Sequence, residues 1–166
     1  MMITVSQEYV NEEGKQMKAV IQRVSECTVK VDGEITGSIE KGLLILLGVA
    51  QDDTEREAEN LSVKISDLRI FTDENDKMNL SVKDVGGAVL VVSNFTLCAD
   101  YRTGRRPFFG SAARPEKAEP LYEYFCECMK KSGLNKVEKG RFGADMKVSL
   151  LNDGPVTLVI DSELLK

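Results

Sequence analysis

The chain has 166 residues, of which 42% are hydrophobic and 30% charged, and its formal net charge is −5. This length and composition are typical of one globular domain, and the negative charge argues against a general nucleic-acid-binding protein. The sequence contains no histidine, which excludes a Ser-His-Asp or Cys-His triad and any histidine-based metal site. It also lacks a Gly-rich phosphate loop of Walker or Rossmann spacing. We therefore expect neither a metal nor a cofactor.

The N-terminal segment and the cysteines bear on location. Residues 1–16 are acidic and lack the apolar core of a secretory signal, and we expect them to be a disordered extension before one domain over 17–166. The longest apolar stretch, residues 42–50, is strand-sized and too short to span a membrane. Four cysteines without C-x-x-C spacing favour free thiols in a reducing cytoplasm. They are Cys27, Cys98, Cys126 and Cys128.

The first part of the chain predicts strands. Residues 18–24 and 27–32 have the pattern of two strands, and Asp32-Gly33 supplies a hairpin turn before residues 35–40. Residues 43–49 are apolar on both faces, which indicates a central strand.

A first helix and three short segments follow. Thr54 and Glu57 form a capping box, and the apolar residues behind it recur at helical spacing. These residues are Ala58, Leu61, Ile65 and Leu68. A short strand is predicted over 69–72, a turn over 73–77, and a further strand over 88–93.

A second helix is predicted from near Pro115 to Ser132-Gly133. Pro120 predicts either a kink or a later start at Glu119. One helical face is apolar and consists of Ala118, Leu121, Tyr122, Phe125, Cys128 and Met129.

The last third predicts three more strands, over 136–142, 145–151 and 155–161. Because short turns join most strand neighbours, the pairing should be mostly antiparallel. We therefore predict a single compact α+β domain of mostly antiparallel strands, forming a barrel or two packed sheets, with two helices.

Two segments place small polar groups where the backbone changes direction. Residues 93–96 read Ser-Asn-Phe-Thr, and Ser93 and Thr96 could be nucleophiles or could cap a turn, since no neighbouring base lowers their pKa. Residues 152–157 read Asn-Asp-Gly-Pro-Val-Thr, in which Pro155 is a candidate cis proline. Asn152 and Asp153 could equally be ordinary turn formers.

The charges are unevenly distributed along the chain. Residues 51–84 carry ten acids and five bases, whereas residues 100–147 carry seven acids and eleven bases. The second segment contains Arg102, Arg105 and Arg106 among aromatic residues, a composition that can neutralise phosphates. The alternative is a solvated loop whose arginines pair with nearby carboxylates.

Seven segments from Met17 onward carry a family resemblance. They are MKAVIQRV at 17–24, GLLILLGV at 42–49, RIF at 69–71, KMNLSV at 77–82, VLVVSNFTL at 89–97, RRPFF at 105–109 and GRFGADMKVSLLNDGPVT at 140–157. In these segments and in their order the chain resembles the D-aminoacyl-tRNA deacylases, and the similarity covers about 145 residues. The family's usual tetrad is Ser-Gln-x-Thr, and Asn94 stands here in place of the Gln.

The resemblance implies a cytoplasmic homodimer that hydrolyses the ester joining a D-amino acid, or mischarged glycine, to tRNA. It implies a pocket at the dimer interface, with the catalytic segment Ser93, Asn94, Phe95 and Thr96 from one subunit. The other subunit would supply the Gly154-Pro155 turn in the cis form, beside Asn152 and held by Arg23. Carbonyls of this turn would occupy the place of an L-amino acid's Cβ, so that L esters are rejected.

A mechanism without histidine is consistent with this chemistry. An aminoacyl ester is already activated, and the vicinal 2′-hydroxyl of the ribose can assist attack by water. The backbone N–H groups of Phe95 and Thr96 would stabilise the oxyanion, while Arg102, Arg105 and Arg106 would contact tRNA phosphates. Direct attack by Thr96 is the alternative mechanism. A non-catalytic tRNA-binding module and a hydrolase of small esters are the alternative functions.

Overall fold

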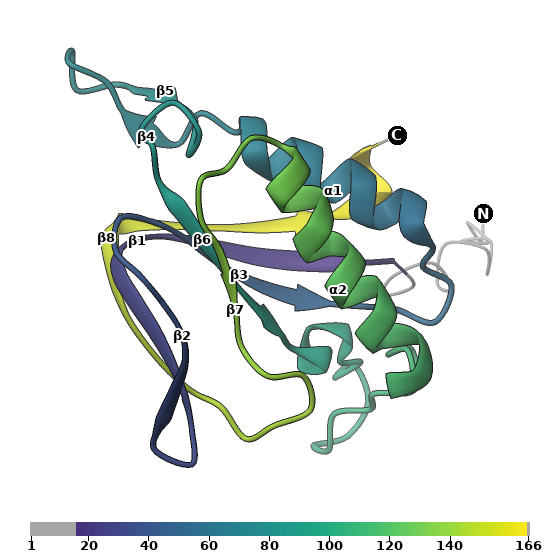
Figure 1. Ribbon diagram of the computed structural model, residues 1–166. Helices are drawn as coiled ribbons and strands as arrows, with labels where there is room; N and C mark the ends of the chain where they lie inside the picture. Colours follow the sequence, from purple (N-terminus) through teal and green to yellow (C-terminus); the bar gives the residue numbers. More distant parts are fainter. Residues whose placement is uncertain (1–15, 166) are drawn as a thin grey trace, which may run out of the picture.

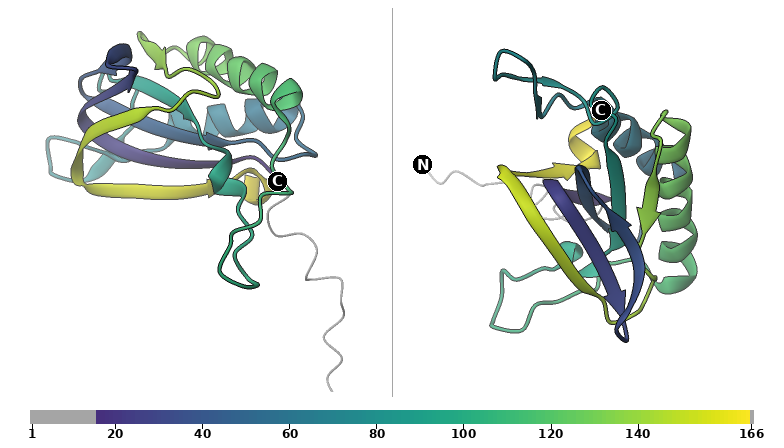
Figure 2. Two further views of the ribbon diagram at one scale, coloured as in Figure 1. Left: turned by 90° about the horizontal axis from the view of Figure 1, so that it is seen from below. Right: turned by 60° about the vertical axis from the view of Figure 1, so that its left-hand side comes forward.

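A computed structural model describes residues 16–165 of the protein. Apart from Gln16, the predicted extension over residues 1–16 lies outside the described residues. A six-stranded sheet has the order β2-β1-β3-β6-β7, with β8 paired to β1, and β4 and β5 form a separate two-stranded sheet. Helices α1 and α2 contact each other and cover one face of the large sheet (Figures 1 and 2).

The elements follow one another with few long connections. The strands are β1 (Lys18–Val31), β2 (Glu34–Ile39), β3 (Gly42–Gly48), β4 (Phe71–Thr72), β5 (Met78–Leu80), β6 (Ala88–Ser93), β7 (Val137–Lys139) and β8 (Lys147–Asp161). The helices are α1 (Glu55–Asp67) and α2 (Pro115–Lys131), and two short 3-10 helices are η2 (Phe95–Cys98) and η3 (Ser162–Leu165).

Strand β1 is continuous, so the prediction of two separate strands over 18–24 and 27–32 is wrong. Its first half pairs with β3 and its second half with β2, and β8 pairs along both halves. Ser25 and Glu26 are both exposed where the strand changes partners, and this interrupts the alternation that suggested two strands.

The change of partners along β1 curls the sheet into a nearly closed barrel. Strand β2 comes close to β6 and β7, although it does not pair with either. Gly37 permits this approach, because a Cβ there would stand 2.7 Å from the carbonyl oxygen of Lys139. The barrel-like α+β class predicted from the sequence is therefore confirmed.

The sheet is mixed. All pairs of β1 and the β4–β5 pair are antiparallel, but β3–β6 and β6–β7 are parallel. Each parallel pair is joined by a connection that contains a helix, α1 in the first case and α2 in the second, as parallel neighbours require. The expectation of mostly antiparallel pairing holds, with these two exceptions.

Both helices begin and end close to the residues predicted from the sequence. The capping box of Thr54 and Glu57 begins α1, and Ser132 ends α2. Helix α2 starts at Pro115 and contains Pro120, so a later start at Glu119 is wrong. Cys126 is buried and Cys128 only partly buried, which corrects the prediction that Cys128 belongs to the core face.

The core has two parts. One fills the space between sheet and helices, and the other fills the interior of the barrel. Side chains of the first include Ile21, Ile45, Leu61, Ile65, Phe125 and Met129, and those of the second include Val24, Cys27, Val29, Ile39, Leu90 and Val92. In residues 16–165 we find no helix that combines the length and the hydropathy of a membrane span.

A buried carboxylate makes the stability depend on pH. Asp53 is 1% exposed and accepts hydrogen bonds from the Met17 N–H at 2.8 Å and the Ala50 N–H at 2.6 Å. Burial raises the pKa of Asp53 to about 6, because desolvation disfavours the charged form. Between its unfolded pKa and this value the native state binds more protons than the unfolded state.

We therefore expect the contribution of Asp53 to the free energy of unfolding to fall by roughly 2–3 kcal/mol as the pH rises from about 4 to about 7. The control is Asp53→Asn, which does not titrate at this position. Urea unfolding of both proteins gives the difference between them at each pH, so that all other titrations cancel. A difference that stays constant or rises over this range would contradict the prediction.

Candidate active site

The Ser-Asn-Phe-Thr segment lies where β6 leaves the sheet. Residues of β6 are buried up to Val92, and Ser93 is half-buried at the strand end. The backbone then turns, because the N–H of Asn94 donates to the carbonyl of Leu47 at 2.8 Å and Asn94 becomes the N-cap of η2. Gly48 lets η2 fold over the end of β3, since a Cβ there would stand 2.9 Å from Cβ of Leu97.

Asn94 determines which hydrogen-bond donors of residues 93–96 remain available to bind a ligand. Its Oδ1 accepts from the N–H of Thr96 at 3.2 Å and from the Thr96 hydroxyl. An amide oxygen is a poor base, so this contact orients the hydroxyl without activating it for attack. Phe95 is the first residue of η2, and an N–H at that position has no acceptor within the helix.

A cavity of about 510 Å³ opens beside this segment. Apart from Val49, which follows β3, three stretches of chain form its wall: the end of β6, the segment that leads into α2 together with the first turn of that helix, and the loop between β7 and β8. The lining residues are Val49, Ser93, Asn94, Phe95, Phe109, Ala112, Ala113, Arg114, Pro115, Ala118, Phe142, Gly143, Ala144 and Met146. Phe95 and Phe109 are in edge contact, with ring centroids 5.2 Å apart. The cavity is thus mainly apolar, with amide and hydroxyl groups on one side.

Sequence reasoning missed two of the three walls. Residues 136–142 were predicted to be a strand, but β7 ends at Lys139, and the following loop carries Phe142, Ala144 and Met146 into the cavity wall. The spacing of Gly140 and Gly143 was an available signal, because Gly143 has φ +75°, which interrupts a strand.

Strand β8 is one strand over Lys147–Asp161, so the prediction of two strands over 145–151 and 155–161 is wrong, and the Gly154-Pro155 turn forms a bulge within it. Gln22 pairs with Thr157 and Val24 with Asn152, so residues 153–156 bulge opposite Arg23. The Gly154-Pro155 peptide bond is cis. The turn is exposed except for Val156.

Side chains predicted to belong together hold this turn. Asn152 Oδ1 accepts from the Val156 N–H at 2.9 Å. Arg23 Nε donates to the Asp153 carbonyl at 2.8 Å, and Arg23 Nη1 donates to the Ile70 carbonyl at 2.8 Å. The Arg23 guanidinium also lies 3.8 Å from the Asp153 carboxylate. Arg23 therefore joins the turn to the segment that begins β4.

The turn and the cavity lie apart in one chain. In Figure 1, β8 bends beside β1 at the left edge of the molecule, whereas β6 ends at the lower right. None of residues 153–156 lines the cavity. The structure therefore brings Ser93, Asn94 and Phe95 together on one side, and Arg23, Asn152, Gly154 and Pro155 together on another.

The arginines lie in a loop over residues 99–114, which we call the arginine loop. Asp100 and Phe108 close it with two backbone hydrogen bonds of 2.7 and 2.8 Å. Arg102 donates through Nε at 2.9 Å and Nη2 at 2.7 Å to the Asp100 carboxylate, which lowers the pKa of Asp100 to about 2. Within residues 16–165, Arg105 and Arg106 form no ion pair.

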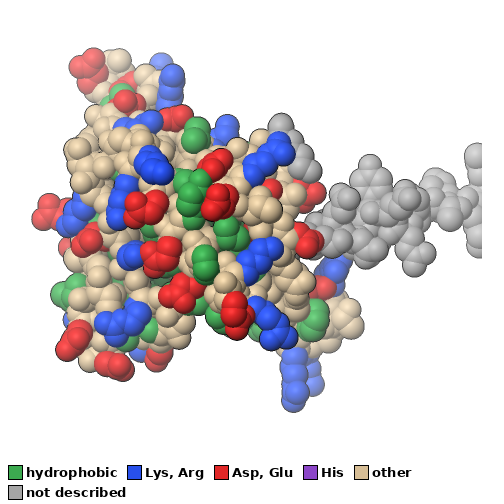
Figure 3. Space-filling model, turned by 45° about the vertical axis from the view of Figure 1, so that its right-hand side comes forward, with side chains coloured by type: hydrophobic (Ala, Val, Ile, Leu, Met, Phe, Trp, Pro, Cys, Tyr) green, Lys and Arg blue, Asp and Glu red, His purple; other side chains and the backbone are tan. Residues whose placement is uncertain are grey.

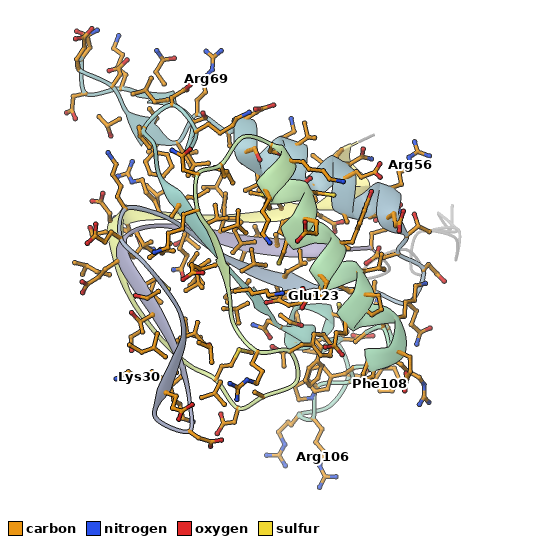
Figure 4. The ribbon with its side chains drawn as sticks, in the orientation of Figure 1. Lys30, Arg56, Arg69, Arg106, Phe108 and Glu123 are labelled. Carbon is orange, nitrogen blue, oxygen red and sulfur yellow. The ribbon has the colours of Figure 1, made fainter. Side chains whose placement is uncertain are left out.

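The distribution of surface charge agrees with the unpaired state of Arg105 and Arg106 in the described residues. Acidic and basic side chains are interspersed over the body of the molecule in Figure 3, whereas basic side chains protrude at its lower end. Figure 4 places Arg106 at that end, pointing away from the domain. In the part of the chain that the structure describes, no group of three or more Cys, Asp or Glu side chains could hold a metal ion.

Fold and cavity define a class of protein: a barrel-like α+β domain with an open cavity at the end of a central parallel strand. The family model described as D-Tyr-tRNA(Tyr) deacylase matches residues 20–161. The D-aminoacyl-tRNA deacylase of Koribacter versatilis is 60% identical over 147 residues, which cover 89% of this chain and 98% of that protein. The corresponding protein of Thermosipho melanesiensis is 57% identical with the same coverage. The chain therefore belongs to the D-Tyr-tRNA(Tyr) deacylase family.

Two solved structures have a fold similar to that of this chain. A structure named c-Myc DNA Unwinding Element Binding Protein is 40% identical, with a TM-score of 0.82, and the match covers 87% of this chain and 97% of that one. A probable eukaryotic D-amino acid tRNA deacylase is 17% identical, with a TM-score of 0.73 over 87% of this chain and 98% of that one. The second likeness supports the fold alone.

Proposed function

We propose that this protein hydrolyses the ester bond of D-aminoacyl-tRNA and releases the free amino acid and tRNA. The observation that carries the proposal is the cavity at the end of β6, which is lined by Ser93, Asn94 and Phe95. It occurs in a chain whose relatives, 57–60% identical, are D-aminoacyl-tRNA deacylases. The mainly apolar wall suits the terminal adenine, and the polar side suits the ester.

The oxyanion of the tetrahedral intermediate is held by the Phe95 N–H. The Thr96 N–H already donates to Asn94, so Phe95 is the stronger of the two donors predicted from the sequence. One preorganised donor of this kind lowers the barrier by about 2.7–4 kcal/mol. The neighbouring 2′-hydroxyl of the ribose assists water, and the Thr96 hydroxyl, bound to Asn94, is not the nucleophile.

The active unit is a homodimer in which the Gly154-Pro155 turn of one subunit completes the cavity of the other. Two observations support it. The turn lies apart from the cavity of its own chain, and β8 exposes apolar side chains that a partner would cover. Leu151 is 58% exposed and Val159 75% exposed. Carbonyls of the turn then collide with the Cβ of an L-amino acid, whereas a D-amino acid or glycine places no Cβ there and fits the cavity.

The substrate tRNA is held through phosphates by the arginine loop. Arg105 and Arg106 are the main contacts, whereas Arg102 is engaged with Asp100 and contributes less. These contacts carry no sequence information. We place the protein in the cytoplasm, where its four free cysteines remain reduced.

Deacylation of matched D- and L-tyrosyl-tRNA by the purified protein tests the function. We expect the D ester and glycyl-tRNA to be cleaved, and the L ester to survive, because the turn collides only with an L side chain. Release of labelled amino acid over time measures the three rates. Equal rates on the D and L esters would refute the selectivity, and no cleavage of any charged tRNA would refute the enzymatic function.

A further inference from the structure

We propose that the arginine loop binds the single-stranded 3′ end of tRNA, including the unpaired nucleotides that precede the terminal adenosine. Tyr101 and Phe108 stack on these bases. Arg105 and Arg106 contact the phosphates that join them. This inference rests on the proposed function, since it specifies which part of the same substrate the arginine loop binds and adds the aromatic contacts.

The first observation is the position of the exposed aromatic rings. Among residues 16–165 the exposed aromatic side chains are Phe95, Tyr101 and Phe108, with exposed fractions of 56%, 78% and 67%. All three lie within one short stretch of chain beside the cavity. Exposed rings add little to the core, and a local group of them marks a binding surface.

The second observation is that the loop is held in shape. Its closing hydrogen bonds join Asp100 to Phe108, and Ser111 Oγ donates to the Cys98 carbonyl at 2.9 Å. The Phe108 ring lies against Gly110, where a Cβ would stand 2.2 Å from Phe108 Cζ. A ring that is already in place loses little conformational entropy when a base stacks on it.

The third observation is charge. The loop contains four arginines and one acid, Asp100, so its net charge is 4 − 1 = +3. Asp100 is engaged with Arg102, which leaves the charges of Arg105 and Arg106 uncompensated by ion pairs in the described part of the chain. Stacking platforms beside basic side chains are the usual means of binding single-stranded nucleic acid. A second copy of the chain fits less well, since a twofold contact would bring like charges together.

The arginine loop also lies beside the cavity, where the nucleotides that precede the terminal adenosine would pass. It follows η2 directly, and Phe109 and Arg114, at its C-terminal side, line the cavity. Figure 4 shows Phe108 near the start of α2 and Arg106 farther out. A strand whose terminal adenosine enters the cavity therefore leaves it over Phe108 and continues toward Arg106.

The test is binding of uncharged RNA hairpins with and without a short single-stranded 3′ extension, measured by fluorescence anisotropy at fixed salt. The wild-type protein should bind the extended hairpin more tightly. Tyr101→Ala and Phe108→Ala should each weaken this binding by about 5-fold to 160-fold, the range for loss of one stacked base. Tyr101→Phe should retain it. Replacing Arg105 and Arg106 by Gln should reduce the salt dependence of log K by a slope of roughly 1–2.

Two control variants match these changes. Ile35→Ala removes an apolar side chain of β2 that is 60% exposed. Arg56→Gln removes an arginine of α1, and Figure 4 shows that Arg56 lies far from the arginine loop. Neither should affect binding. Equal affinity for the two hairpins, or ring variants that bind like wild type, would overturn the proposal. Ring variants that instead convert a dimer to monomers would also overturn it, in favour of a contact between subunits. Because uncharged RNA is used, failure of this proposal is distinct from absence of deacylation.

Discussion

Gly154→Ala should lower kcat/KM for deacylation of D-aminoacyl-tRNA by about 100-fold or more, the cost of misplacing a positioning group by about 1 Å. Gly154 has φ +150°, and a Cβ there would stand 2.8 Å from the Val156 nitrogen and 3.2 Å from Arg23 Nη2. The turn must therefore shift. Gly33→Ala is the control, since Gly33 also has positive φ, +80°, but no atom lies within 4 Å of the added Cβ. Retained activity in Gly154→Ala would show that the turn has no part in the site.

The same variant tests whether the turn acts across the dimer. A second inactive variant with damage on the cavity side, Phe95→Pro, should complement it. A mixed dimer combines the intact cavity of one chain with the intact turn of the other. After subunit exchange between equal amounts, about a quarter of wild-type activity should return, because half of the dimers are mixed and each has one complete site. A mixture that stays inactive would place both halves of the site in one chain.

Phe95→Pro should lower kcat for the D ester by about 10²–10³-fold, the cost of removing one oxyanion donor. Proline removes the backbone N–H, and it suits this place because Phe95 is the first residue of η2 and Asn94 before it is extended, with φ −144° and ψ 90°. Phe95→Ala is the matched control, which removes the ring and keeps the N–H. Equal losses in the two variants would assign the effect to the ring.

Thr96→Val should retain much of the activity, since the main chain persists and the hydroxyl of Thr96 only binds Asn94. A tRNA that ends in 2′-deoxyadenosine should resist the wild-type enzyme, because the assisting hydroxyl is absent. Single-turnover rates with both substrates distinguish the routes. Rapid cleavage of the deoxy substrate together with an inactive Thr96→Val protein would instead establish an acyl-threonine intermediate.

The sequence by itself determined the local elements. Thr54 and Glu57 mark the start of α1, Asp32-Gly33 marks the hairpin, and the run of apolar residues at 43–49 marks the central strand. Each signal depends on residues close in sequence, whose capping bonds or turn dihedrals do not require the rest of the fold. The colinear motifs from Met17 onward also indicated the family, which the comparisons confirm.

Only the tertiary structure decided how these elements combine. Nothing local indicates that β1 changes partners halfway, that β6 runs parallel to β3, or that Phe142 and Met146 meet Ser93 around one cavity. Asn94 likewise appeared in the sequence only as a shorter amide. Its hold on the Thr96 N–H, and the separation of the Gly154-Pro155 turn from the cavity, depend on backbone direction at the ends of β6 and within β8. Pairing and packing between distant segments set these directions, and short sequence patterns do not encode such contacts.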